Sequence, residues 1–304
     1  MKRQLITIIL ALAAVCGGAQ EAIDTAQFVA VYDYECRTQD ADGLDVTDRM
    51  QLVVQVGRTV TKSMPLSAYK RMDMEEEDDI IAAHQEAYLH MPTVWTGYPE
   101  GQTTVRDWIF PHEFEGSERL RERLRVGASA GMGEQSSGMP TPEIAWTLTD
   151  DTLTIGGYYC QTATCKFRGV EWHVCYTEEI PSSAGPWRLR GLPGLIVKAE
   201  NEAHTFCLIE LRQEYTPITA PDKNPDVQRM PYAKLLKHRN DVYGNRQYAK
   251  NPFFHVPDLN GGNLSLGGSI RHMEVFELGG QQLAFADGHP LLTKAPVYQP
   301  LEAK

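Results

Sequence analysis

The stretch TLTIGGYYCQTATCKFRGVEWHVCYT, residues 152–177, decides the fold of this 304-residue chain. It is rich in Thr, Tyr, Val, Ile and Trp, the residue types that favour β-strands. Arg168 and Gly169 stand where the chain can fold back on itself. That turn places Phe167 opposite Val170 in an antiparallel hairpin. The stretch therefore predicts neighbouring antiparallel strands.

Similar short runs occur on both sides of this stretch, and we interpret them as further strands at residues 27–36, 50–56, 59–63, 144–148, 195–200, 205–213, 269–278 and 281–286. We predict helices in three places, from apolar spacing at residues 80–89, from a capped start at residues 117–124, and in the segment at residues 230–248. The predicted fold is mainly β (α+β), with a curved antiparallel sheet and two or three packed helices. An open half-barrel would satisfy this pattern.

The composition is that of a folded globular chain, with 42% hydrophobic and 23% charged residues. One segment departs from it, because residues 127–142 are rich in Gly, Ser, Met and Pro. We expect a mobile loop there. A linker between two domains is the alternative, but strand-rich sequence flanks both sides. We therefore predict one domain over residues 20–304.

The first residues have the order of a secretory signal peptide. Lys2 and Arg3 precede an apolar run at residues 5–15, and small residues follow at 17–19. We predict that residues 1–19 are removed and that the protein is exported to the periplasm, the cell surface or the medium. Cys16 raises a lipoprotein signal as a rival. No later segment reaches the roughly 20 apolar residues that a transmembrane helix needs.

The charge excludes one class of partner. Removing residues 1–19 deletes two basic and no acidic residues, so the formal charge moves from −11 to −13. Binding to nucleic acid requires a basic face that replaces condensed counterions. We therefore expect no nucleic-acid partner.

Five cysteines remain after that cleavage, and an exported chain meets an oxidising compartment. In the hairpin predicted above, Cys160 and Cys175 are diagonal neighbours. Cys165 and Cys175 would instead point to opposite faces. We predict Cys160–Cys175 as the better disulfide, with Cys207 on a later strand as a competitor.

No catalytic residue, cofactor or metal site is predicted with a specific motif. The chain lacks His-Glu-x-x-His and the phosphate-binding Gly-x-x-x-x-Gly-Lys. Glu171, His173 and Cys175 would share one face of a strand and could converge on a soft metal ion. A half-exposed histidine beside a buried or bonded cysteine is the interpretation that we favour.

Residues 144–200 resemble the GLPGLI family of exported Bacteroidetes proteins. The resemblance rests on the signature and its surroundings, namely Gly191, Leu192, Pro193, Gly194, Leu195 and Ile196, together with Trp172, Tyr176, Pro181, Gly185 and Pro186. The ending Tyr298, Pro300, Leu301 and Glu302 is similar to the usual family ending. The resemblance implies export and a related fold, and it implies no established activity.

The residues of the signature also have a structural explanation. Gly191 and Gly194 can adopt positive φ angles, and Pro193 fixes a bend before residues 195–197 enter a buried strand. We favour a structural corner. A ligand-binding loop, in which glycines admit a close backbone approach, is the alternative.

These observations favour a non-enzymatic binding or carrier module of the cell envelope. Its ligand would be an apolar compound, another small molecule or an envelope protein. Aromatic side chains on neighbouring strands would form core or line a slot, namely Tyr158, Tyr159, Trp172, Tyr176 and Trp187. The alternatives are a secreted hydrolase with a site assembled from distant residues, and a structural partner of an outer-membrane complex.

Overall fold

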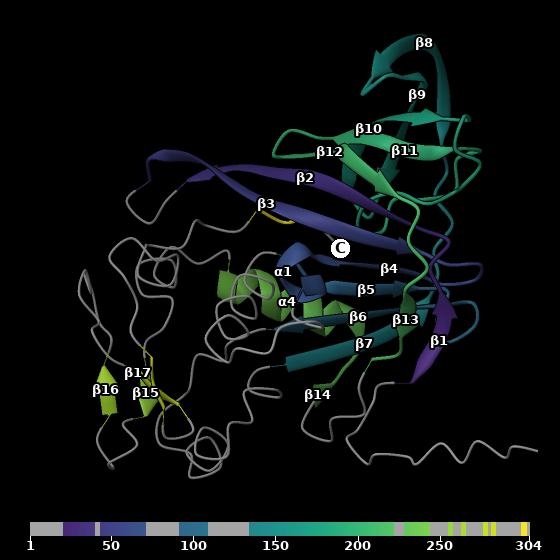
Figure 1. Cartoon of the computed structure of the whole chain (residues 1–304). Helices are drawn as coiled ribbons and strands as arrows, with labels where there is room; N and C mark the ends of the chain where they lie inside the picture. Colours follow the sequence, from purple (N-terminus) through teal and green to yellow (C-terminus); the bar gives the residue numbers. More distant parts are fainter. Residues whose placement is uncertain are drawn as a thin grey trace, which may run out of the picture.

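The computed structural model (Figure 1) describes residues 21–39, 43–70, 91–108, 134–221, 228–243, 255–257, 263–265, 276–278, 281–283 and 299–302. The predicted signal peptide, the predicted helices at residues 80–89 and 117–124, and the Gly-rich stretch at residues 261–262 and 266–268 lie outside them.

One sheet of twelve strands dominates the described residues, in the order β14-β7-β6-β5-β4-β3-β2-β12-β11-β10-β9-β8. Its first half contains β2 (Phe28–Gln39), β3 (Asp45–Val56), β4 (Thr61–Pro65), β5 (Thr93–Thr96), β6 (Gln102–Trp108), β7 (Glu134–Pro140) and β14 (Gln228–Arg229). Its second half contains β8 (Thr147–Ile155), β9 (Tyr158–Phe167), β10 (Val170–Thr177), β11 (Leu195–Glu200) and β12 (His204–Arg212). All neighbours are antiparallel except β14 and β7, which are parallel. The order is open, with β14 and β8 at its edges.

Three small two-stranded sheets complete the strands that the structure describes. They pair β1 (Ala22–Thr25) with β13 (Pro217–Thr219), β15 (His255–Pro257) with β16 (Asn263–Ser265), and β17 (Phe276–Leu278) with β18 (Gln281–Leu283). The last pair confirms, in shortened form, the two strands that were predicted around Gly279 and Gly280.

The β9–β10 hairpin has the predicted register. Phe167 pairs with Val170, and Cys165 pairs with Trp172. Arg168 and Gly169 both have positive φ angles, of 47° and 90°. Positive φ at both central residues defines the type I′ turn, whose twist matches that of the strands. The two-residue turn therefore fixes which side chains of β10 face the core.

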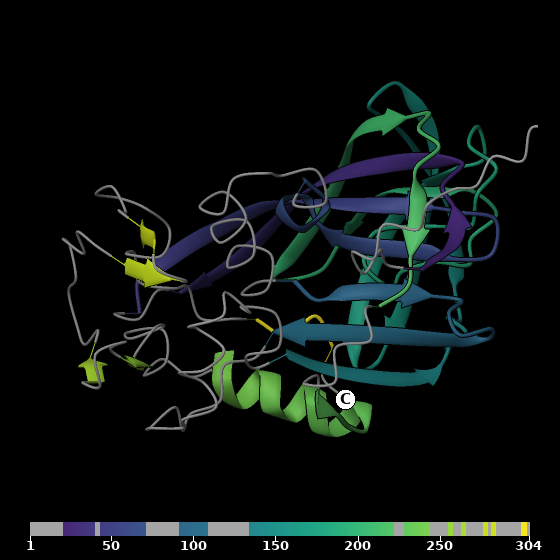
Figure 2. The ribbon, with the colours of Figure 1, turned by 60° about the horizontal axis from the view of Figure 1, so that its bottom comes forward.

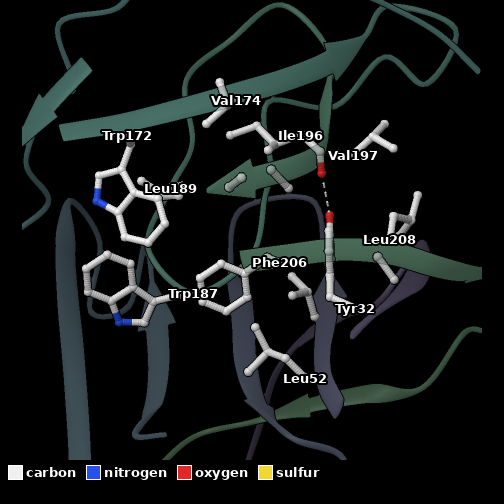
Figure 3. Close-up of a cluster of buried hydrophobic side chains, with 14 of the residues drawn as sticks. Tyr32, Leu52, Trp172, Val174, Trp187, Leu189, Ile196, Val197, Phe206 and Leu208 are labelled. Carbon is white, nitrogen blue, oxygen red and sulfur yellow. Dashed lines mark hydrogen bonds between the residues drawn. The ribbon is translucent and has the colours of Figure 1, made fainter. Parts of the chain in front are cut away.

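Alternation along β2 separates two cores on opposite faces of the sheet. Ala30 and Tyr32 belong to the larger cluster, which we call the main core, whereas Val29 and Val31 belong to a second, smaller cluster. The main core also receives β9 to β12 and side chains from the loop before β11. Figure 3 shows Trp172, Trp187 and Phe206 packed together there.

The expected layer of two or three packed helices is wrong. Among the described residues, α4 (Tyr232–Tyr243) is the one helix longer than two turns, and α1 (Leu66–Lys70) has five residues. Helix α4 lies along β7 at one end of the sheet (Figure 2). It falls within the segment at residues 230–248 that the sequence predicted as helical. Trp187 and Leu189 from the loop before β11 belong to the main core and Ile218 of β13 belongs to the smaller cluster, so loops and a small strand supply part of the cover that the prediction assigned to helices. The fold is mainly β.

Most of the described part of the predicted mobile loop forms a strand. Residues 134–140 form β7, which pairs with β6 over seven consecutive positions. Its composition, EQSSGMP, gives no strand signal. Pairing with β6 supplies the backbone hydrogen bonds that the local sequence does not favour, so tertiary context overrides propensity.

Candidate functional site

The signature forms a tight corner over the main core. Leu195 and Ile196 are fully buried, whereas Gly191 and Pro193 lie on the outside. A Cβ added at Gly194 would lie 2.0 Å from the backbone oxygen of Thr177. Gly194 is therefore required by close backbone approach, and the predicted positive φ at this position is wrong.

Two other glycines hold the corner for different reasons. Gly191 does have a positive φ, of 99°, and its N–H donates to the Ser183 carbonyl at 2.9 Å. At Gly185, a Cβ would lie 2.6 Å from the Leu189 carbonyl oxygen. Trp146 adds an indole N–H bond to the Arg190 carbonyl at 2.9 Å. The corner is held by backbone fit and backbone hydrogen bonds.

This corner delivers one arginine into the interior. Trp187 has a φ of 55°. This left-handed conformation costs energy in a bulky residue, so the packing around Trp187 must stabilise it. The next side chain, Arg188, is only 4% exposed. A buried guanidinium is costly unless it is paired, and its partner comes from the far end of the described chain.

Glu302 is that partner, and it lies 114 residues away in sequence. Arg188 Nη1 donates to Glu302 Oε1 at 2.7 Å and to the Tyr232 hydroxyl at 2.9 Å. The Tyr232 hydroxyl donates to the same carboxylate oxygen. Arg168, from the β9–β10 turn, forms an ion pair with the other oxygen, Oε2. We call these four residues the Glu302 site.

Aromatic rings surround the two guanidinium groups. Arg188 lies 5.4 Å from the Phe167 ring centroid and 4.9 Å from that of Tyr232. Arg168 lies 4.9 Å from the Tyr232 ring on its own side. Cation–π attraction strengthens as water is excluded. The rings therefore help to hold two positive charges in the interior, but they do not replace an anion.

Two arginines of the Glu302 site contact one carboxylate that is 2% exposed. The buried Nε of Arg188 has no hydrogen-bond partner among the described residues, although Nη2 contacts the Met139 sulfur at 3.2 Å. Two guanidinium groups next to one tyrosine hydroxyl form a geometry that selects a carboxylate.

A second buried polar pair lies on the same core. The His204 Nε2 donates to the Pro300 carbonyl at 3.3 Å, so Nδ1 accepts from the Tyr34 hydroxyl at 2.9 Å. Burial lowers the pKa of His204 to about 4. The histidine is therefore neutral near pH 7, with both ring nitrogens engaged.

The cysteines do not form the predicted disulfide. Cys160 and Cys175 are free thiols, as are Cys165 and Cys207. Cys175 pairs with Thr162, so Cys160 is its diagonal neighbour, as the predicted register requires. Burial raises the pKa of Cys165 to about 12 and that of Cys175 to about 11. These thiols are protonated and weakly nucleophilic near pH 7.

The predicted metal candidates share one face of β10 but do not assemble a site. Glu171, His173 and Cys175 alternate as expected, and His173 faces Glu200 on the next strand. In the part of the chain that the structure describes, no three His, Cys, Asp or Glu side chains come close enough to hold a metal ion.

The aromatic residues divide between the core and the surface. Trp172, Tyr176 and Trp187 are buried in the main core, whereas Tyr159 is 57% exposed. The Tyr32 hydroxyl in the same core donates to the Ile196 carbonyl at 2.8 Å (Figure 3). The predicted aromatic slot is thus packed core for these three residues.

Sequence reasoning missed two features. The Glu302 site joins residues from four distant segments, and its one signal in the sequence was the family-like ending. Residues 127–131, GASAG, fit the Gly-x-Ser-x-Gly pattern of hydrolase elbows. That segment lies outside the described residues. In a hydrolase elbow the serine is followed by a helix. The next element that the structure describes after residues 127–131 is strand β7, Glu134–Pro140.

Comparisons with known proteins give no family and no close relative. No protein-family model matches the sequence, and no curated protein matches it. Among described residues, no helix is long and apolar enough to cross a bilayer.

Solved structures give distant likenesses. Two crystal forms of PNGF-II match with 12% and 11% identity and TM-scores of 0.42 and 0.39, covering 71% and 69% of this chain. The chain spans about a third of the PNGF-II length, 33% and 32%. A LolA-superfamily protein, NE2245 from Nitrosomonas europaea, matches with 11% identity and a TM-score of 0.21, covering 65% of this chain and 89% of that one. At these scores, none of the three indicates a function for this chain.

Proposed function

We propose that the protein is an exported, non-enzymatic binding module of the cell envelope that recognises a carboxylate on an apolar ligand. One observation carries the proposal: two arginines and a tyrosine converge on one buried carboxylate in the Glu302 site. Such a fork of donors beside aromatic rings is an arrangement that proteins use to fix a carboxylate.

The geometry of the other buried groups supports binding over hydrolysis. A catalytic cysteine needs a lowered pKa, but burial raises the pKa of Cys160, Cys165, Cys175 and Cys207. A general base needs a free nitrogen, and both nitrogens of His204 are engaged with Tyr34 and Pro300.

The binding test uses the full mature chain carrying Leu301→Ala and Glu302→Gln, which removes the resident carboxylate. The probes are octanoate, N-acetyl-leucyl-glutamate with its α-carboxyl group amidated, and the glutamine counterpart of that amide. We expect the two carboxylates to raise the melting temperature and the glutamine compound to leave it unchanged. Adding Arg188→Met should abolish the shift. A chain that no carboxylate stabilises would overturn the proposed site.

Turnover is the second measurement. Ester, peptide and glycoside substrates are incubated with the wild-type chain, and we expect rates equal to buffer. Hydrolysis that disappears in Ser129→Ala would overturn the non-enzymatic proposal and favour the hydrolase alternative.

Export is tested separately by measuring the intact mass of the secreted protein. We expect the mass of a chain that begins at Gln20.

A further inference from the structure

One face of strands β9 to β12 carries three cysteines. Cys175 of β10 pairs with Thr162 of β9. On its other side it pairs with Lys198 of β11, which pairs in turn with Cys207 of β12. Paired residues on neighbouring strands point to the same face, and so do residues two apart in one strand. Cys160, two residues before Thr162, therefore lies on this face as well.

The sheet keeps the other cysteines out of reach of Cys175. Cys207 is two strands away, roughly 10 Å at the usual strand spacing. A disulfide joins Cα atoms that are at most about 7 Å apart. Cys36 is on β2, which both β11 and β12 separate from β10. Cys165 is on the adjacent strand, but its odd offset of three residues from Thr162 points it to the opposite face.

Cys160 is within reach of Cys175. The two are diagonal neighbours on adjacent strands, where Cα atoms lie about 7 Å apart. The last pair of the β9–β10 ladder is Gln161 with Tyr176, so Cys160 lies just beyond that ladder and can approach β10 by a small shift. The thiols also interact electrostatically, because burial and then the neighbouring Cys160 raise the pKa of Cys175 to about 11.

From this geometry we infer that Cys160 and Cys175 form a redox switch on the β9–β10 hairpin. Both are thiols in the structure. A small disulfide oxidant, such as oxidised glutathione, converts them to a disulfide that ties the end of β9 to β10, and a thiol reductant reverses the reaction. The inference is independent of the proposed function, because no residue of the Glu302 site takes part.

Exposure sets the order of the two steps. Cys175 is partly exposed, whereas Cys160 is fully buried. The Cys175 thiolate attacks one sulfur of the oxidant, and the other sulfur leaves as a thiolate and takes up a proton. The Cys160 thiolate then attacks the Cys175 sulfur of this mixed disulfide and expels the second thiol. Two protein thiols are oxidised, and one oxidant disulfide is reduced to two thiols.

The new bond would act on the edge of the sheet. In the order of the described strands β8 is an edge, most of its residues are exposed, and its Leu153 pairs with Cys160. Local opening concentrates in such weakly covered elements. A bond from Cys160 to the inner strand β10 prevents the end of β9 from separating together with β8. The redox state thereby sets how readily this edge opens.

The test incubates the full mature chain in reduced and oxidised glutathione, alkylates the remaining thiols and maps the disulfides without reduction. We expect one internal bond, Cys160–Cys175, with a loss of two hydrogen atoms in mass and full reversal by dithiothreitol. Its rate should rise about 10-fold per pH unit between about pH 7 and 9, since the thiolate fraction of Cys175 does so. Hydrogen exchange of the β8 amides should slow about 10-fold in the oxidised chain.

Single substitutions test the order of the steps. Cys160→Ala should stop at the mixed disulfide, with one glutathione on Cys175, and Cys175→Ala should form no internal bond. Cys207→Ala is the matched control, because Cys207 is partly exposed on the same face, and it should leave the Cys160–Cys175 bond unchanged.

Three outcomes overturn the inference. The first is a wild-type chain that stays reduced at every ratio of reduced to oxidised glutathione, a result that needs no variant to fold. The second is an internal bond from Cys175 to Cys165 or to Cys207. The third is a Cys160–Cys175 bond that leaves hydrogen exchange in β8 unchanged, because such a bond would be no switch.

Discussion

The corner and the segment at residues 299–302, which we call the closing segment, cover the same core by different means. The corner at residues 180–196 is held by backbone hydrogen bonds and by glycines with no room for a side chain. The closing segment is held through the ion pair between Glu302 and Arg188 and through a hydrogen bond from His204 Nε2 to the Pro300 carbonyl. The difference teaches that the stability of the corner depends on backbone fit, whereas that of the closing segment depends on a buried charge pair and on the protonation state of a histidine.

The largest effect should come from breaking the charge pair. Arg188→Met leaves Glu302 buried beside a single arginine, and removal of one partner from a buried pair costs about 3 to 5 kcal/mol. The free energy of unfolding, measured by urea denaturation, gives this loss. The control Lys198→Met breaks the pair with Glu200, whose side chain is 44% exposed, and should cost under about 1 kcal/mol.

A double substitution sharpens this prediction. Arg188→Met with Glu302→Leu replaces the pair by apolar groups and should recover part of the loss. A double variant that is no more stable than Arg188→Met alone would contradict the charge explanation.

Next in size is the corner. In Gly194→Ala the new Cβ meets the Thr177 carbonyl at 2.0 Å, so the backbone must shift, and we expect a loss of about 3 kcal/mol. Gly138→Ala is the matched control, because its Cβ would lie 3.5 Å from the nearest atom, a side-chain oxygen. Equal stability of the two variants would show that the corner is not sterically tight.

The closing segment should also respond to pH, which the corner should not. The folded pKa of His204, about 4, lies below the unfolded value of about 6.5, so the unfolded chain takes up the proton first. The contribution of His204 to the free energy of unfolding is fully present above about pH 6.5 and declines as the pH falls toward 4. From these values, the loss between pH 7 and pH 5 is about 2 kcal/mol.

His204→Gln tests the origin of this dependence, because glutamine keeps a donor and an acceptor but does not titrate in this range. The stability of that variant should change by less than about 0.5 kcal/mol over the same window. Asp24, whose pKa is lowered, loses its contribution only below pH 4 and does not interfere. An unchanged pH slope in the variant would assign the effect to another group.

The smallest effect should come from a single hydrogen bond of the corner. Trp146→Phe removes the indole donor to the Arg190 carbonyl, and we expect a loss of about 1 kcal/mol. Tyr159→Phe, at an exposed ring, is the control and should change stability by less than about 0.5 kcal/mol. Equal losses in the two variants would show that the Trp146 hydrogen bond does not stabilise the corner.

Local sequence determined the elements whose signals are short-range. The β9–β10 hairpin followed from Arg168 and Gly169, because a two-residue turn fixes the register of the strands that it joins. Helix α4 lies within residues 230–248, the segment that the sequence predicted as helical. The corner was predicted as a structural feature from its glycines and proline, although the reason at Gly194 proved to be close packing and not positive φ.

Only the tertiary structure decided the rest, because it depends on contacts between residues far apart in the chain. The EQSSGMP segment became strand β7 by pairing with β6, and no local signal encodes a partner strand. Arg168, Arg188, Tyr232 and Glu302 came together over 134 residues of sequence. Each of them alone resembles an ordinary surface residue. Burial makes Arg188 and Glu302 depend on each other, because a charge in a low-dielectric interior requires a partner of opposite charge.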